Sequence, residues 1–212
     1  MSRDDAVQQP PAPGLDLTGF PAKHVREGTV WRRAHRASHA PWFYATGRGG
    51  RFDLPLPAGT CYLATTVETA AREVIGPDFI ASGIIPDSLL SDRVVSEVLL
   101  PHAVRAARLT SSDAFGFGIT NELCSTADYP VSQRWAAAFH RDRFDGIWYQ
   151  PRFSPGSGRA LAVFGPSGPR DDSALTQTPL ATVIRTMPGL TIARTNDRRE
   201  YEVLDEPRGS SA

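Results

Sequence analysis

Hydrophobic positions change their spacing within one short stretch of the chain, from a continuous run to a helical repeat. The run TCYLA, residues 60–64, follows a Pro-Ala-Gly turn and predicts a short strand. Apolar residues then recur at 67, 70, 71 and 74, the spacing of one helix face. Thr65 with Glu68 forms a capping box, and Gly76-Pro77 is an expected stop. The pattern therefore predicts a strand and a short helix, with Glu73 near the helix C-terminal end.

The remaining apolar runs predict a sheet and one further helix. Pro130 is expected to open this helix, whose apolar face includes Trp135 and Phe139. No GxGxxG or GxxxxGK[ST] motif occurs, so the usual dinucleotide and P-loop cradles are absent. The pattern favours an α+β fold with mixed, mostly antiparallel sheets and a few helices. Short strands are expected at residues 29–34, 94–100, 104–109, 146–149, 160–164, 182–185, 190–194 and 201–204.

Polar and turn-forming segments delimit the expected domain. Residues 1–20, rich in Pro and Gln, are expected to form a flexible leader, and residues 206–212 a disordered tail. Residues 165–179 are the strongest candidate for an internal linker or loop, because turn formers and charges replace apolar periodicity there. We therefore expect a single domain over residues 21–205.

Charge and composition narrow the classes of partner. The chain has 23 Lys and Arg against 23 Asp and Glu, which argues against a nucleic-acid binder or a polybasic membrane binder. It has neither an apolar run long enough to span a membrane nor a start typical of a signal peptide, so we expect a cytoplasmic protein. The two cysteines and five histidines show no metal-ligand spacing, and no metal is expected. The sequence leaves open whether the chain forms a homo-oligomer.

Several polar side chains near the strand and helix suit a ligand with phosphates and a flat ring. Arg51 ends a loop, Tyr62 lies in the strand and Glu73 in the helix. Arginine can fork onto phosphate oxygens, tyrosine can stack on a ring, and glutamate can stabilise a developing cation. The aromatic run that ends at Tyr44 has two interpretations: packing in the core or in a loop, which the sequence favours, and a ring platform for the ligand, for which Tyr44 is the candidate. A hydroxyl-rich loop covers residues 150–159.

Three segments resemble the RES-domain family over about residues 29–165. They are RFDLPLPAGTCYLATTVETAAREV, DYPVSQRWAAAFHRDRFDGIWY and RALAVFG. The resemblance implies a fold similar to that of ADP-ribosyltransferases. It also implies an enzyme that destroys NAD⁺ by hydrolysis or phosphorolysis, as the toxin of a toxin–antitoxin pair. NAD⁺ is then the substrate, and inorganic phosphate and an antitoxin protein are the expected partners. The domain over residues 21–205 would be RES-like.

The family takes its name from an Arg, a Glu and a Ser. Glu73 matches the glutamate, and Tyr62 matches a tyrosine of the family's YLA strand. The arginine has two candidates, Arg32 on the first strand and Arg51. The family serine follows the Asp-Gly-Ile-x-Tyr pattern by two positions, where this chain has Pro151.

Ser154 and Ser157 are the alternative sources of that hydroxyl, or its role is vacant. In the implied chemistry, Glu73 stabilises an oxocarbenium-like ribose and an arginine binds the pyrophosphate. Tyr62 packs on a ring, and the loop hydroxyl orients Glu73 or the ribose. An ADP-ribosyltransferase and a non-catalytic binding module are the alternatives to an NAD⁺-degrading enzyme.

Overall fold

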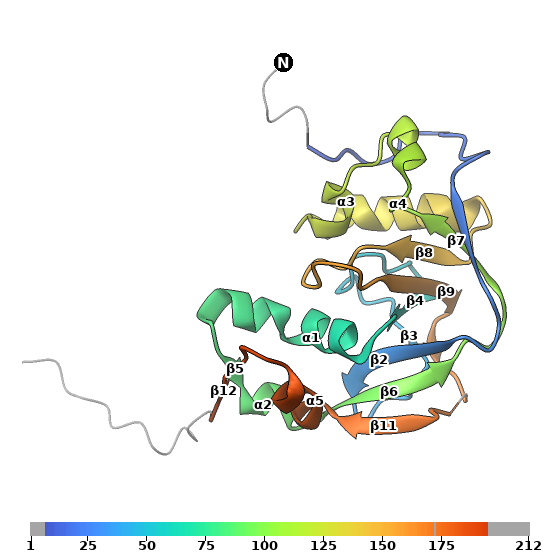
Figure 1. Ribbon diagram of the computed structural model, residues 1–212. Coiled ribbons are helices and arrows are strands. Elements are labelled where there is room, and N and C mark those ends of the chain that lie inside the picture. The colour runs from blue at the N-terminus through green and yellow to red at the C-terminus, as the bar shows by residue number, and fades with distance from the viewer. Residues whose placement is uncertain (1–6, 172, 195–212) are drawn as a thin grey trace, which may run out of the picture.

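A mixed eight-stranded sheet forms the centre of the computed structural model, which describes residues 7–171 and 173–194 (Figure 1). Among its neighbouring strands, β7 and β8 run parallel and the other pairs run antiparallel. This arrangement, with helices packed against the sheet, confirms the predicted α+β class. The strand order is β1 (Ala22–Val25), β7 (Val104–Arg108), β8 (Gly146–Tyr149), β9 (Ala160–Pro166), β4 (Ala58–Ala64), β2 (Val30–Arg36), β6 (Arg93–Leu99) and β11 (Thr176–Pro179).

Shorter elements complete the described chain. Two small strand pairs lie outside the large sheet: β3 (Phe43–Tyr44) with β10 (Gly168–Pro169), and β5 (Ile85–Pro86) with β12 (Ile192–Ala193). The helices are α1 (Val67–Ser82), α2 (Asp87–Leu90), α3 (Glu122–Ser125), α4 (Tyr129–Arg141) and α5 (Leu180–Thr186), with a 3-10 helix at Ser112–Phe117.

Helices pack on the sheet at two places (Figure 1). α4 contacts β8 and buries Trp135 and Phe139, so its predicted apolar face faces the core. α1 and α5 contact β2 and β6 respectively, where a second cluster includes Ile75 and Val95. β4 lies between these regions and therefore connects both packed clusters.

α1 is longer than the sequence predicts. It begins after Thr66, whose hydroxyl accepts a hydrogen bond from the Thr69 N–H at 3.1 Å, so the expected capping pair was wrong. The helix then continues through Gly76-Pro77 to Ser82, because residues on both sides of the dipeptide pack in the core and around the site. Glu73 therefore lies in the helix interior rather than in its last turn.

The chain after β9 also differs from expectation. Residues 182–185, predicted as a strand, belong to α5, which buries Leu180, Val183 and Ile184 at helical spacing. Residues 165–179 contain β10 and β11 rather than only a linker, and β11 pairs with β6. β12 falls within the strand expected at 190–194. The strand expected at 201–204 and the tail at 206–212 lie outside the described residues.

Residues 7–20 pack against the domain instead of forming a flexible leader. Leu17 and Phe20 are buried in the same cluster as Trp135. The indole N–H of Trp135 donates to the Gln9 carbonyl at 2.9 Å, and the Gln8 N–H donates to Glu122 at 2.7 Å. Leu15, Leu17 and Phe20 account for this packing, since they belong to or pack against the cluster that contains Trp135. Residues 1–6 lie outside the described part.

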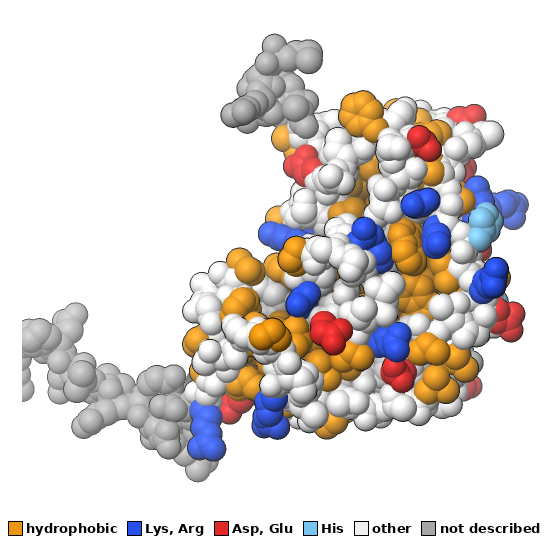
Figure 2. Space-filling model, in the orientation of Figure 1, with side chains coloured by type: hydrophobic (Ala, Val, Ile, Leu, Met, Phe, Trp, Pro, Cys, Tyr) orange, Lys and Arg blue, Asp and Glu red, His pale blue; other side chains and the backbone are white. Residues whose placement is uncertain are grey.

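Lys and Arg side chains are spread over the face shown in Figure 2, with hydrophobic and acidic side chains between them. This distribution agrees with the balanced charge of the sequence. Within the described residues, every helix is too short or too polar to cross a membrane.

Candidate active site

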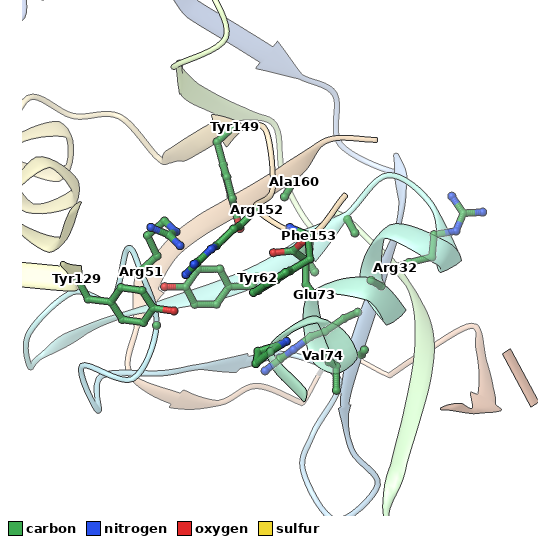
Figure 3. A pocket seen from close by; sticks show the side chains of 17 residues that line it. Arg32, Arg51, Tyr62, Glu73, Val74, Tyr129, Tyr149, Arg152, Phe153 and Ala160 are labelled. Carbon is green, nitrogen blue, oxygen red and sulfur yellow. Dashed lines mark hydrogen bonds between the residues drawn. The ribbon is translucent and has the colours of Figure 1, made fainter. Parts of the chain in front are cut away.

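A cavity of about 250 Å³ lies beside α1 and collects side chains from distant parts of the chain (Figure 3). β2, β4, α1, α4 and the loops before β4 and after β8 all contribute to its lining. It brings together three residues that the sequence nominated, Arg51, Tyr62 and Glu73. Arg32 also contributes to the lining.

The carboxylate of Glu73 is held by the loop at residues 150–159. Its Oε1 accepts hydrogen bonds from the Phe153 N–H at 2.8 Å and from the Ser154 hydroxyl at 3.3 Å. Burial raises the pKa of Glu73, while these two donors oppose the rise. The result is a half-buried carboxyl group that the loop fixes at the wall of the cavity.

Ser154 is the loop serine that reaches Glu73. It is fully buried, whereas Ser157 is exposed, and neither serine is among the residues that line the cavity. Pro151, at the expected serine position, is buried too. The loop thus brings a hydroxyl to Glu73 from three positions further along the chain.

Tyr62 holds the loop that carries Arg51. Its hydroxyl donates to Asp53 Oδ1 and accepts from the Phe52 N–H, both at 2.8 Å. The other oxygen of Asp53 accepts from the Gly50 N–H at 2.8 Å. Burial and the neighbouring Asp53 carboxylate raise the pKa of Tyr62 well above its usual value. Tyr62 therefore stays neutral, with its hydroxyl engaged by the loop and its ring beside the cavity.

Gly50 is needed for this close approach. A Cβ at Gly50 would lie 2.5 Å from the Tyr62 hydroxyl and 2.3 Å from Asp53 Oδ1. The sequence contains this Gly-Arg-Phe-Asp segment, but its spacing alone does not show that Asp53 binds Tyr62.

The two candidate arginines have different surroundings. The Arg51 side chain is largely buried, donates to the Thr126 carbonyl and lies over the Tyr129 ring, with 5.1 Å between Cζ and the ring centroid. Arg32 binds Glu97 Oε1 at 2.8 Å and the Thr65 carbonyl at 3.2 Å. In Figure 3, Arg32 lies apart from the group formed by Arg51, Tyr62 and Tyr129. The geometry favours Arg51 as the arginine that faces the ligand.

Tyr44 lies in the core and is not among the cavity-lining residues. It is 1% exposed and stacks on Trp42, with 6.2 Å between the ring centroids. It clusters with Cys61 and Leu63, which alternate with Tyr62 along β4 and so face the opposite side of the sheet. The expected role of Tyr44 in ligand binding is therefore replaced by the alternative, packing in the core.

The further lining residues that the sequence did not single out include Tyr129, Tyr149, Arg152 and Phe153. Burial and the charge of Glu73 both raise the pKa of Tyr149, whose ring packs edge-on against Phe52 at 4.9 Å. Both tyrosines occur in the segments DYP and DGIWY, which carry the family resemblance. The family resemblance of these segments was therefore a signal for both tyrosines. Their expected positions, at a helix start and in a strand, did not by themselves indicate a role in ligand binding.

Metal ligands do not gather here. The described residues contain no group of three or more His, Cys, Asp or Glu side chains that could hold a metal ion. The polar groups of the cavity are instead a carboxylate, guanidinium groups and phenols.

Comparisons with known proteins agree with this fold. A search among curated proteins found no match. One similar solved structure is a chain of the M. tuberculosis MbcT–MbcA toxin–antitoxin complex, with a TM-score of 0.61 and 17% identity. The match covers 78% of this chain and 91% of that one, and at this identity it shows a common fold. The family model described as "RES domain" matches residues 29–184, most of the chain. The chain therefore belongs to the RES-domain family.

Proposed function

We propose that this protein is a RES-type toxin that consumes NAD⁺ by cleaving the bond between nicotinamide and ribose. Family membership and the fold shared with a chain of a toxin–antitoxin complex support this proposal. The observation that carries it is the Glu73 carboxylate, fixed by two donors in a cavity that Arg51 also lines. An exposed glutamate without such donors or a cavity would be weak evidence for a catalytic role.

The reaction needs stabilisation of positive charge more than acid catalysis. When the bond breaks, its electron pair goes to the ring nitrogen, so the positively charged pyridinium leaves as neutral nicotinamide. The ribose carbon becomes oxocarbenium-like, and the nearby Glu73 carboxylate stabilises it. Partial burial strengthens this interaction, because fewer water molecules screen it. Water then adds to the same carbon and releases a proton to the solvent, or phosphate adds through an anionic oxygen.

The other cavity residues bind and orient the dinucleotide in this proposal. Arg51 binds the pyrophosphate, since its guanidinium presents several donors to phosphate oxygens. The rings of Tyr62, Tyr129 and Tyr149 pack on the nicotinamide and ribose. Ser154 orients Glu73 through its hydroxyl. Holding the reacting groups in place in this way supplies a large part of the rate enhancement of such reactions.

A toxin of this kind acts on the NAD⁺ of the cytoplasm and needs a partner that restrains it. We infer an antitoxin that covers the cavity, because access to Glu73 is what the reaction requires. Direct contact between the antitoxin and the residues around Arg51 or Arg152 would block NAD⁺.

Product analysis tests the proposed function. Purified protein is incubated with NAD⁺, with and without inorganic phosphate, and products are separated by chromatography. Release of nicotinamide with ADP-ribose indicates hydrolysis, and release with phosphorylated ADP-ribose indicates phosphorolysis. Label transferred to another molecule would instead indicate an ADP-ribosyltransferase. Absence of nicotinamide release under all conditions would contradict the proposal and favour a binding module.

A further inference from the structure

Arg159 and Gln150 hold the loop that brings Ser154 to Glu73 through hydrogen bonds within the loop. We call this set of bonds the brace. Within this loop, residues 150–159, Gln150 Nε2 donates to the Ser154 carbonyl oxygen. Arg159 Nη1 donates to three oxygens: Gln150 Oε1, the Gly156 carbonyl at 2.9 Å and the Gly158 carbonyl at 2.8 Å. A chain of hydrogen bonds therefore leads from Arg159 through Gln150 to the backbone of Ser154.

The base of the loop is fixed to the start of α1. The Thr65 N–H donates to the Arg159 carbonyl at 2.9 Å, and the Arg159 N–H donates to Thr65 Oγ1 at 3.0 Å. Gly158 also lies against the helix, since a Cβ there would be 2.4 Å from Thr69 Oγ1. These contacts fix the position of the loop relative to α1, the helix that carries Glu73.

We propose that Gln150 and Arg159 are positioning residues for Glu73, because they hold the loop so that the Phe153 N–H and the Ser154 hydroxyl meet its carboxylate. The proposal rests on the proposed function and deepens it. Neither residue lines the cavity, so they act through the loop rather than on the ligand.

Pro151 explains why such a brace is required. Proline has no hydroxyl to give to Glu73 and no N–H to give to the loop. The hydroxyl donor must then come from Ser154, three positions further along the loop. Ordering the non-proline residues of the loop costs conformational entropy. The Arg159 and Gln150 bonds offset that cost by satisfying three loop carbonyls at once.

In this proposal, Gln150 and Arg159 also affect the ionisation of Glu73 through the loop donors. The Phe153 and Ser154 donors lower the pKa of Glu73, in opposition to burial, which raises it. If the two donors move out of hydrogen-bonding range while Glu73 stays buried, burial is less opposed and the pKa of Glu73 rises further. Arg152 moves with the loop, and its backbone also lowers the pKa of Glu73. The charged or titratable groups of the cavity outside the loop stay in place: Arg32, Arg33, Arg51, Tyr62, Tyr129 and Tyr149.

Arg159→Met tests the brace, because it removes the guanidinium and keeps most of the aliphatic stem. We expect kcat for NAD⁺ cleavage to fall about 10- to 100-fold, as for other misplaced catalytic groups. The acid limb of the pH–rate profile should also move to higher pH. Arg134→Met is the matched control, since Arg134 is exposed on α4 and outside the site. It should change neither quantity.

A second variant and a second readout separate this inference from the proposed function. Gln150→Leu removes the hydrogen bond to the Ser154 carbonyl and should shift the pH–rate profile in the same direction, but by less. If Arg159→Met does not fold, Gln150→Leu is the variant that tests the proposal. The Glu73 carboxyl is also titrated by NMR in ¹³C-glutamate-labelled protein without NAD⁺. Unchanged Glu73 titration in both folded variants would overturn the brace. Lack of nicotinamide release by the wild type would overturn the proposed function alone.

Discussion

Phe153 packs its ring onto Gly76, in the space that a side chain on α1 would occupy. A Cβ at Gly76 would lie 2.2 Å from Cγ of Phe153. The backbone N–H of the same Phe153 donates to Glu73 Oε1 at 2.8 Å. The missing side chain at position 76 is therefore what allows the loop to come close enough to hold Glu73.

Gly76→Ala should separate activity from stability. Alanine favours the helix by about 1 kcal/mol over glycine, while overpacking against Phe153 costs about 1–3 kcal/mol. The free energy of unfolding, measured with urea, should thus fall by about 2 kcal/mol or less. Nicotinamide release should fall about 10- to 100-fold, because the loop is displaced from Glu73. A folded Gly76→Ala variant with wild-type turnover would contradict this account.

Tyr62→Phe should destabilise the loop that carries Arg51. The change removes the hydroxyl that pairs with Phe52 and Asp53, and leaves an N–H and a carboxylate oxygen without that partner. We expect the free energy of unfolding to fall by about 1–3 kcal/mol. KM for NAD⁺ should rise as Arg51 loses its position. Tyr129→Phe, which removes another phenol from the same cavity, serves as the control and should have a smaller effect on unfolding.

Arg51 and Arg32 should respond differently to replacement by lysine. Lysine keeps the charge but loses the forked donors and the flat surface that lies over Tyr129. Arg51→Lys should therefore raise KM for NAD⁺ about tenfold or more. Arg32 is paired with Glu97, so Arg32→Lys should have a smaller effect on KM. Steady-state kinetics on both variants show which arginine binds NAD⁺. A larger rise in KM for Arg32→Lys than for Arg51→Lys would make Arg32 the ligand-binding arginine.

The raised pKa of Glu73 has consequences for both activity and stability. Its usual value is 4.5, so the ionised form needed for catalysis is lost at a higher pH than for an exposed glutamate. The folded protein binds this proton more tightly than the unfolded chain does. The stability contribution of Glu73 is therefore present at low pH and is lost as pH rises through the folded pKa.

Glu73→Gln does not titrate and should avoid that loss. At neutral pH its melting temperature should equal or exceed the wild-type value, and the gap should narrow below the usual glutamate pKa. Thermal unfolding of both proteins across this pH range tests the expectation. A variant that is markedly less stable at neutral pH would show that the Glu73 charge stabilises the fold.

The sequence predicts elements well where one periodicity dominates. The run at 60–64 and the face formed by Trp135 and Phe139 each have a single reading, and both elements lie where they were expected. Gly76-Pro77 was misleading because its local signal is a helix stop, whereas packing of Phe153 against Gly76 is a contact between distant residues. The short apolar run in α5 fits either period, and only its burial decides between them.

The site was predictable to a similar extent. Glu73, Tyr62 and Arg51 carried both suitable chemistry and a family match, and the structure brings them to one cavity. Tyr44 had suitable chemistry alone, and strand alternation places it on the other side of β4. The Glu73–Ser154 contact depends on how one loop folds over α1. No spacing rule expresses such a contact when the usual serine position is a proline.

The most direct test of the account compares two glutamates of α1. Nicotinamide release from NAD⁺ is measured for the wild type, for Glu73→Gln and for Glu68→Gln, which alters an exposed residue in the first turn of the same helix. The account predicts that Glu73→Gln remains folded but loses about 100-fold or more of the rate, while Glu68→Gln keeps it. A folded Glu73→Gln protein that releases nicotinamide at the wild-type rate would contradict the central role of Glu73.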